Sequence, residues 1–421
     1  MRVGIIDAEL LSKAQIRFPN LACMKMSAFH KSRGDTVEFL ESYDAVSNFD
    51  MVLVSKVFSD TPFPDDVLNF YHVIPGGTGF FYDKYGDRLM LPDAQEHVMP
   101  DYSLYVPWAT REAVSGRKEN DLRYYTDYSI GFLTRGCFRR CSFCVNKNSR
   151  QAVLWSPPAE FIDTTRPGVC LLDDNFFACS SWESAFSDLE KIVRDNRLRF
   201  EFKQGLDIRL MDDARAEALS RTASLYSGDY IFAFDRWEYH KSVAAGLEVF
   251  RRYISNRGAK AYLLCAYLEN PTDEDYVHDI EYIFRRLEIL WEYACLGYLM
   301  RYDRCLSVPR KFKDIYTNLA RWLNQPSFQK KLTFRVFCNK SSPRCAEKLS
   351  LFEKAYPEFS VLFDRAYPHG SSPYLDASYH DPWSSRVFNH EDPIVKKYWG
   401  DARKSCKGSV KTKTNKKAVP G

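Results

Sequence analysis

The stretch Thr134-Arg-Gly-Cys-Phe-Arg-Arg-Cys-Ser-Phe-Cys144 places three cysteines in a C-x3-C-x2-C pattern directly after a predicted strand. Three thiolates on one short loop can hold three corners of a metal cluster, and the same loop cannot easily supply a fourth. This arrangement suits a [4Fe-4S] cluster with one iron left open for an exogenous ligand. The three arginines of the stretch favour thiolate over thiol and offset the negative charge of a cluster. The predicted metal ligands are Cys137, Cys141 and Cys144.

A structural zinc site is the alternative for these cysteines, and it needs one further Cys or His. With the basic C-terminal tail, that alternative describes a non-catalytic, zinc-stabilised nucleic-acid-binding protein.

Candidate strands and helices alternate from Tyr128 onward. The expected strands span 128–133, 169–172, 200–203, 230–234, 261–267 and 295–302. The expected helices span 182–195, 212–220, 242–254, 273–290 and 312–323. Helix 182–195 is the clearest, because Ser180 and Glu183 form a capping-box pair ahead of an apolar face. Six strands, each followed by a helix, predict a parallel βα array, either an open sheet or a partial barrel.

The cysteine loop resembles the cluster motif of the radical S-adenosylmethionine superfamily, in which a C-x3-C-x2-C loop follows the first strand of a partial (β/α)6 barrel. Phe143, the aromatic residue before the last cysteine, also matches this motif. The resemblance implies an open iron that binds the amine and carboxylate of S-adenosylmethionine. One electron would cleave that molecule to methionine and a 5′-deoxyadenosyl radical, which abstracts hydrogen from a substrate. It also implies an electron donor such as flavodoxin or ferredoxin.

Polar residues follow several of the expected strands. Gln204-Gly-Leu-Asp-Ile-Arg209 is similar to a segment of the Elp3/MiaB/NifB-like branch of this superfamily. Strand-end residues of a barrel converge on its active-site face, whereas helix caps and surface salt bridges are the structural alternative. The candidate cofactor-binding residues are Phe143, Asp173, Asp174, Asn175, Gln204, Asp207, Arg209, Asp235 and Arg301.

The first 110 residues are expected to form an open parallel α/β domain of the flavodoxin type. Strands are expected near 3–6, 36–40 and 51–57, and a helix over 21–30. A fourth apolar run directly precedes the glycines of the segment Val73–Gly79. The glycines of Val73-Ile-Pro-Gly-Gly-Thr-Gly79 either let backbone approach a ligand or form a turn that needs positive φ.

This domain resembles the cobalamin-binding domain of many radical S-adenosylmethionine enzymes, through Pro19-Asn20-Leu21 and the Gly-Gly turn. It departs from the best-known cobalamin pattern because no Asp-x-His-x-x-Gly is present, and His30 is interpreted as structural. Cobalamin therefore stays an open alternative.

The expected division is 1–110 for the cobalamin-domain-like unit, 125–327 for the barrel and 328–402 for a C-terminal extension. Residues 81–124 are interpreted as a polar connector whose aromatic part, 100–107, packs on a domain. Within the extension, 334–337 and 359–363 are expected to be short strands. Residues 403–421 are expected to be a disordered basic tail.

The composition limits which binding partners and which cellular location are expected for the chain. The 421 residues carry a net charge of +4, and seven basic residues between Arg403 and Lys417 account for more than that excess. The body is thus about neutral or slightly acidic, which argues against global nucleic-acid binding. No signal peptide or membrane span is recognisable, so a cytoplasmic location is expected for the 12 cysteines. The substrate is expected to be a small molecule or peptide, with RNA as the alternative.

Overall fold

The computed structural model describes residues 1–12, 18–85, 90–255, 257–302 and 307–368. The chain divides into two compact units, Met1–Phe232 and Ala233–Gly421. The finer four-part division expected from the sequence stays a prediction. None of the helices in the described ranges is long and apolar enough to cross a membrane.

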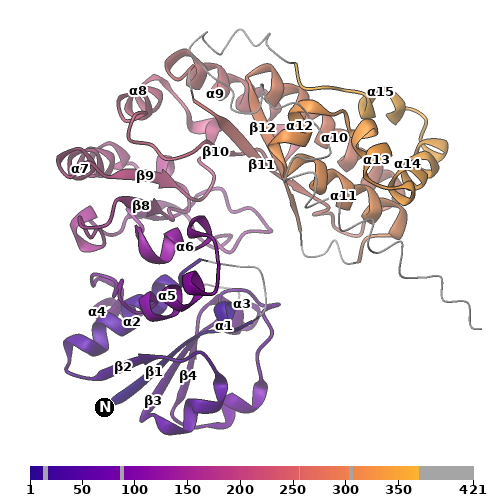
Figure 1. Ribbon diagram of the computed structural model, residues 1–421. Coiled ribbons are helices and arrows are strands. Elements are labelled where there is room, and N and C mark those ends of the chain that lie inside the picture. The colour runs from indigo at the N-terminus through magenta and orange to yellow at the C-terminus, as the bar shows by residue number, and fades with distance from the viewer. Residues whose placement is uncertain (13–17, 86–89, 256, 303–306, 369–421) are drawn as a thin grey trace, which may run out of the picture. The chain divides into compact units, whose positions relative to one another are not determined.

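The first unit begins with the expected open parallel sheet. Its four strands pair in the order β2-β1-β3-β4, and every pair is parallel (Figure 1). Apolar runs form these strands because both faces are covered: Val3 and Ile5 enter one core cluster, whereas Ile6 and Val52 enter another. The strands are β1 Arg2–Asp7, β2 Thr36–Phe39, β3 Met51–Ser55 and β4 Val73–Gly76. The helical elements are α1 Ala8–Leu11, α2 Leu21–Ser32, η1 Tyr43–Asn48, η2 Asp65–Asn69 and α3 Thr78–Tyr85.

The segment expected to be a polar connector is instead helical, with α4 Asp93–Glu96, α5 Val106–Val114 and α6 Glu119–Thr126. The prediction of a connector was wrong because short helices can carry many polar residues. Asp93, Thr110 and Glu119 are exposed on them, whereas Glu96 is buried. Its aromatic part packs as expected, since Tyr102 and Tyr105 are buried in the same cluster as Val3 and Ile130.

The first three strands of the expected barrel also lie in the first unit. Strands β5 Tyr128–Gly131, β8 Gly168–Leu171 and β9 Arg199–Phe202 are parallel and pair in chain order. The first strand is not followed by an α-helix, in contrast to the expectation. An antiparallel pair, β6 Thr134–Gly136 with β7 Ala152–Leu154, and the turn η3 Pro158–Glu160 occupy that place.

The helices that follow β8 and β9 lie where the sequence predicts them. Helix α7 spans Trp182–Asp195 and α8 spans Asp213–Arg221, with the short turns η4 Phe176–Ala178 and η5 Ile208–Leu210 before them. The capping box at Ser180 and Glu183 is not formed. The N-cap of α7 is Ser181, which makes no side-chain cap hydrogen bond.

The second unit begins inside β10 Tyr230–Ala233 and continues with β11 Ala259–Cys265 and β12 Cys295–Arg301. These strands pair in the order β10-β11-β12, and β11 and β12 are parallel over seven residues. The expected helices are present as α9 His240–Tyr253, α10 Asp273–Glu292 and α11 Arg310–Leu323, after the turn η6 Trp237–Tyr239.

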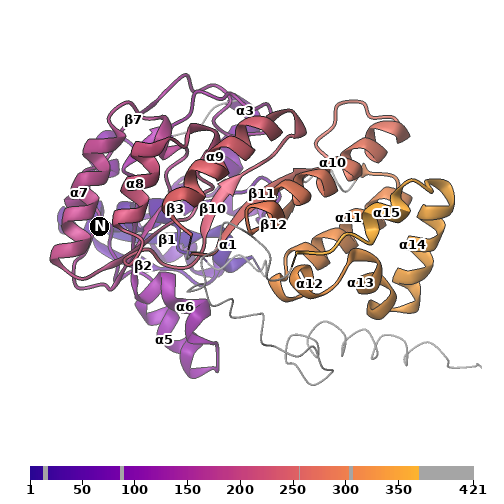
Figure 2. The same cartoon turned by 90° about the horizontal axis from the view of Figure 1, so that it is seen from above.

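The C-terminal extension is helical where short strands were expected. Both views show α12 to α15 gathered beside α11 (Figures 1 and 2). Residues 334–337 lie in α13 and 359–363 form α15, because their phenylalanines recur at helical spacing. Phe363 packs against both Phe334 and Phe359. The elements are α12 Pro326–Lys331, α13 Phe334–Ser341, α14 Pro343–Ala355 and α15 Phe359–Phe363. The tail 403–421 lies outside the described residues.

The buried Tyr105 side chain connects the segment before α5 to the carboxyl end of β1. The Tyr105 hydroxyl donates to Asp7 Oδ2 at 2.8 Å and accepts a hydrogen bond from the Asn20 backbone N–H at 3.2 Å. Asn20 in turn donates from Nδ2 to Ser55 Oγ at 2.9 Å. The loops after β1 and β3 are therefore held together through Tyr105.

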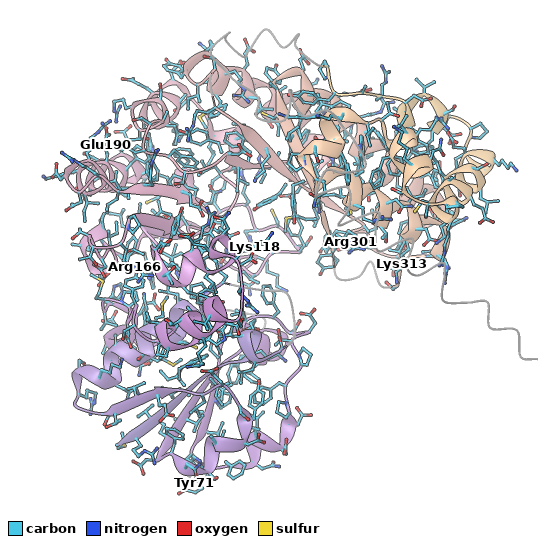
Figure 3. The ribbon with its side chains drawn as sticks, viewed as in Figure 1. Tyr71, Lys118, Arg166, Glu190, Arg301 and Lys313 are labelled. Atoms are coloured by element: carbon cyan, nitrogen blue, oxygen red, sulfur yellow. The ribbon has the colours of Figure 1, made fainter. Side chains whose placement is uncertain are left out.

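Tyr105→Phe should lower the free energy of unfolding by about 1–3 kcal/mol, because it leaves buried Asp7 and Asn20 groups without a partner. Tyr71→Phe is the matched control, since Tyr71 is 98% exposed at the edge of the same unit (Figure 3). Urea unfolding monitored by circular dichroism measures both variants. Equal stabilities of the two variants would contradict the role given to Tyr105.

Candidate functional site

The cysteine loop is anchored by a hairpin rather than by a helix. It leaves β6 at Gly136, whose φ of +96° is unfavourable for any residue with a side chain. A Cβ at this position would also collide with the carbonyl oxygen of Gln151, on the returning side of the loop. The loop adopts a second positive φ at Arg140, of +52°. Glycine at 136 is therefore required by the path of the backbone into the loop.

The three predicted cluster ligands are half-buried, whereas the seven other cysteines in the described ranges are buried. N–H groups point at two of the sulfurs. Cys137 Sγ accepts hydrogen bonds from the Arg139 backbone N–H and from Asn175 Nδ2, both at 3.4 Å. Cys144 Sγ accepts one from the Asn146 backbone N–H at 3.4 Å. Donors of this kind stabilise thiolates and tune the clusters that they bind.

Within the described ranges, no three Cys, His, Asp or Glu side chains converge closely enough to hold one metal ion. A [4Fe-4S] cluster sets a different requirement, because each thiolate ligates its own iron. The half-exposed cysteines and the N–H donors at their sulfurs fit that requirement.

Three consecutive residues after β8 hold successive positions of the cysteine loop. Asp173 accepts hydrogen bonds from the Leu133 and Thr134 backbone N–H groups, at 3.3 and 2.6 Å, and from Thr134 Oγ1 at 2.7 Å. Asp174 Oδ2 accepts one from the Gly136 backbone N–H at 2.9 Å, and Asn175 donates to Cys137.

Asp173 is only 4% exposed, and burial raises its pKa to about 7 despite the donors from Thr134. Asp173 is one of the candidate cofactor-binding residues predicted from the sequence. In the structure, both Asp173 oxygens are already committed to the loop. Asn175 differs, because its Oδ1 is buried and has no hydrogen-bond partner. Asn175 thus offers an unused acceptor beside Cys137.

The end of β9 contributes Asp207, which the loop reaches through Arg139. Arg139 Nε donates to Asp207 Oδ2 at 2.7 Å, and Arg209 Nε donates to Asp207 Oδ1 at 2.6 Å. Burial alone would raise the pKa of Asp207, but the hydrogen bonds and charges of Arg209 and Arg139 outweigh it and lower that pKa. Asn175 Nδ2 also lies 3.4 Å from Asp207 Oδ2. The structure therefore brings together the predicted residues at the ends of β8 and β9.

Two candidate cofactor residues lie in the second unit and are described there. The backbone carbonyl of Asp235 accepts a hydrogen bond from Arg286 Nη1 at 2.7 Å, and Asp235 lines a separate cavity of about 490 Å³. Arg301 is exposed at the end of β12, and its Nη1 donates to Thr317 Oγ1 at 3.3 Å (Figure 3). Phe143 is half-buried within the cysteine loop. The roles assigned to these three residues stay predictions.

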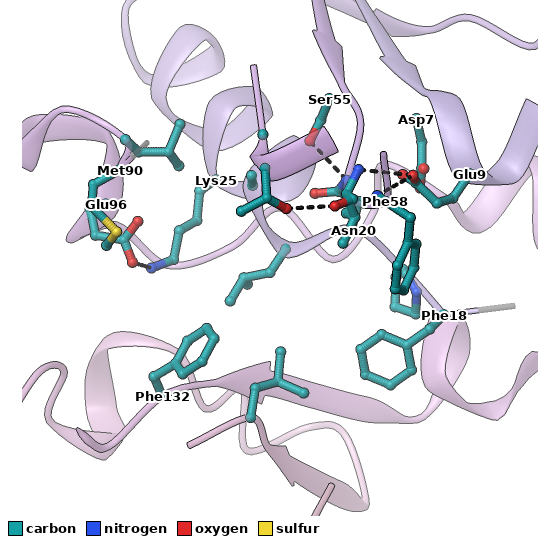
Figure 4. Close-up of a pocket in the computed structure, with 18 of the residues that line it drawn as sticks. Asp7, Glu9, Phe18, Asn20, Lys25, Ser55, Phe58, Met90, Glu96 and Phe132 are labelled. Carbon is teal, nitrogen blue, oxygen red and sulfur yellow. Dashed lines mark hydrogen bonds and ion pairs between the residues drawn. The ribbon is translucent and has the colours of Figure 1, made fainter. Parts of the chain in front are cut away.

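A cavity of about 460 Å³ lies in the first unit, at the carboxyl ends of its strands (Figure 4). Predicted residue Gln204 lines it, and so does Arg135, two residues before Cys137. Four charged residues of its wall were not predicted as site residues. Asp7 is the last residue of β1, Glu9 lies on α1, Lys25 on α2 and Glu96 on α4. An acid at the end of a buried strand was the available signal for Asp7.

Two interpretations of the glycine-rich turn after β4 were open: a turn that needs positive φ, and a backbone that approaches a ligand. Gly77 has a φ of +93°, and a Cβ there would collide with the Lys56 carbonyl oxygen. The turn thus needs glycine for its own backbone path. Gly77 and Thr78 also line the cavity.

Comparison with known proteins gives a likeness of fold. No protein-family model matches the chain, and no curated protein matches it. The chain is similar to the structure of the cobalamin-dependent S-adenosylmethionine radical enzyme OxsB with aqua-cobalamin bound, at 12% identity and a TM-score of 0.45, covering 85% of this chain and 61% of that one. Apo, selenomethionine-labelled OxsB is similar at 11% identity and a TM-score of 0.34, covering 71% and 49%.

The mixed α/β fold class with parallel sheets is as expected. The chain spans about three fifths of the length of OxsB.

Gly136→Ala should prevent the loop from closing and remove most of the iron that the reconstituted protein binds. Gly116→Ala is the matched control, because Gly116 has a similar φ of +92° but open space around it. Iron per chain after anaerobic reconstitution is the measurement. Iron retained by Gly136→Ala to the level of Gly116→Ala would contradict the requirement at 136.

Proposed function

We propose that this chain is a radical S-adenosylmethionine enzyme whose [4Fe-4S] cluster is held by Cys137, Cys141 and Cys144. One observation carries the proposal: a C-x3-C-x2-C loop follows the first of three parallel strands, and N–H donors point at its sulfurs. When bound, such a cluster supplies the electron that cleaves S-adenosylmethionine to methionine and a 5′-deoxyadenosyl radical. That radical abstracts hydrogen from the substrate.

The chain's own residues would hold and tune this site. Asp173 and Asp174 fix the backbone ahead of Cys137 through four hydrogen bonds. Asn175 stabilises the Cys137 thiolate, and its unused Oδ1 supplies an acceptor for the ammonium group of S-adenosylmethionine. Arg139 offsets the negative charge of the cluster while it pairs with Asp207.

Cobalamin is not required by this proposal. No histidine is among the residues that line the cavity in the described part of the first unit. His30 lies elsewhere, and its Nδ1 is 2.8 Å from Asp35 Oδ2. The described residues of the cavity wall would therefore offer no imidazole to a bound corrinoid.

The proposed reaction needs an external electron donor, such as a flavodoxin or ferredoxin, and a small-molecule or peptide substrate. An RNA substrate is the alternative, which rests on the basic residues between Arg403 and Lys417. Deleting residues after Ala402 and measuring RNA affinity separates these two substrate classes.

Replacing the three cysteines tests the proposal directly. Wild-type protein, reconstituted anaerobically, should bind about four irons per chain and release 5′-deoxyadenosine when reduced with S-adenosylmethionine. Cys137→Ala, Cys141→Ala and Cys144→Ala should each lose most of the iron and all 5′-deoxyadenosine.

Cys345→Ala is the control, because Cys345 lies on α14 in the second unit. It should keep both iron and turnover. A colourless protein that binds about one zinc through the same cysteines would overturn the proposal in favour of a structural zinc site.

A further inference from the structure

Glu9 presents an unused carboxylate oxygen in the wall of the 460 Å³ cavity. Its Oε1 accepts hydrogen bonds from the Val57 and Phe58 backbone N–H groups, at 2.8 and 3.2 Å, and from Thr61 Oγ1 at 2.9 Å. Its Oε2 is buried and has no hydrogen-bond partner, and the residue is only 4% exposed. A buried carboxylate oxygen without a donor costs free energy. A donor on a ligand in the cavity would remove that cost.

A second acid stands beside Glu9 at the carboxyl end of β1. Asp7 is buried, and burial, with a smaller contribution from the Glu9 charge, raises its pKa to about 7. Within the described ranges, neither acid forms an ion pair with a basic side chain. This end of the cavity therefore presents the Glu9 carboxylate with no paired cation among the described residues.

The acid at the far end of the cavity already has two cationic neighbours, because Arg135 Nη2 lies 3.9 Å from Glu96 Oε1 in addition to Lys25. Lys25 Nζ donates to Glu96 Oε1 at 2.8 Å, and the same oxygen accepts a hydrogen bond from Trp155 Nε1 at 3.0 Å. Figure 4 shows this pair at the opposite side of the cavity from Asp7 and Glu9. With two cations on one carboxylate, this end does not attract a cationic group, so the cationic group of a ligand belongs at Glu9.

Between the two ends the wall is apolar and rich in rings. A volume of about 460 Å³ suits one small organic molecule. The apolar side chains that face it include Phe18, Leu21, Phe58, Leu91, Phe132 and Leu172.

We propose that this cavity binds a small organic amine, in which an ammonium or other cationic N–H group donates to Glu9 Oε2 and a ring-containing apolar body fills the remainder. Phe132 and Leu172 directly follow β5 and β8, the strands whose ends carry and hold the cysteine loop. The cavity would therefore be the substrate site, an assignment that rests on the proposed function, whereas amine binding itself does not.

Calorimetric titration of the full chain with 2-phenylethylamine and with its neutral analogue 2-phenylethanol tests the proposal. The amine should bind wild-type protein at least about tenfold more tightly than the alcohol, as expected for a charged hydrogen bond. Glu9→Gln should abolish this preference. Glutamine keeps an oxygen for Val57, Phe58 and Thr61, so the fold has little reason to change. Glu38→Gln, at an exposed site on β2, is the control and should keep the preference.

A second variant keeps the test meaningful if Glu9→Gln is unstable. Ala22→Trp should fill the cavity and weaken the binding of the amine without touching the Glu9 hydrogen bonds. Equal affinities of wild-type protein for amine and alcohol would overturn the proposal, because water would then satisfy Oε2 as well as a ligand does. An unchanged preference in Glu9→Gln would overturn it too.

Hydroxocobalamin provides a third arm. Hydroxocobalamin could bind stoichiometrically, displace the amine and bind Glu9→Gln equally well. That result would assign the cavity to a corrinoid and overturn the proposal. Iron content and 5′-deoxyadenosine release are measured separately, so loss of amine binding is distinguishable from failure of the proposed radical chemistry.

Discussion

The Asp173 carboxylate is the constraint on which the rest of the candidate site depends. It gathers the backbone N–H groups of Leu133 and Thr134 and the Thr134 hydroxyl at the end of β8. This contact fixes how the chain leaves β5, and with it the hairpin that opens the cysteine loop. Asp174 and Asn175 then make similar contacts two and three residues after Thr134, at Gly136 and Cys137. A strand end thus sets the register of the loop.

Strand positions were predictable because buried parallel strands are short apolar runs, and the loop was predictable because C-x3-C-x2-C is rare. The elements that were predicted wrongly have two causes. Helices α13 and α15 are built from phenylalanines whose recurrence at three and four residues is ambiguous in so short a run. The segment 81–124 was misjudged because its few buried rings, Tyr102 and Tyr105, are diluted among polar residues.

The partners of the site residues were beyond sequence reasoning. Asp173 was expected to face S-adenosylmethionine, and nothing in the spacing reveals that Thr134 already satisfies it. The sequence gives no sign of the role of Glu9 either. That role depends on its hydrogen bonds, because Oε1 accepts three and Oε2 accepts none. Residue type and strand position predict which groups are available, and only the tertiary contacts decide which remain unused.

Asp7 and Asp173 are both buried carboxyl groups with a raised pKa. Burial raises the pKa of each from 3.8 to about 7, so the folded state binds their protons more tightly than the unfolded state does. Their contribution to stability is therefore favourable at low pH and is lost as pH rises from about 4 through 7. Neither group favours folding at neutral pH by its charge. Both lie at strand ends that border the cysteine loop or the cavity. Perturbed carboxyls concentrate at functional sites because burial and neighbouring charges there match pKa values to the chemistry.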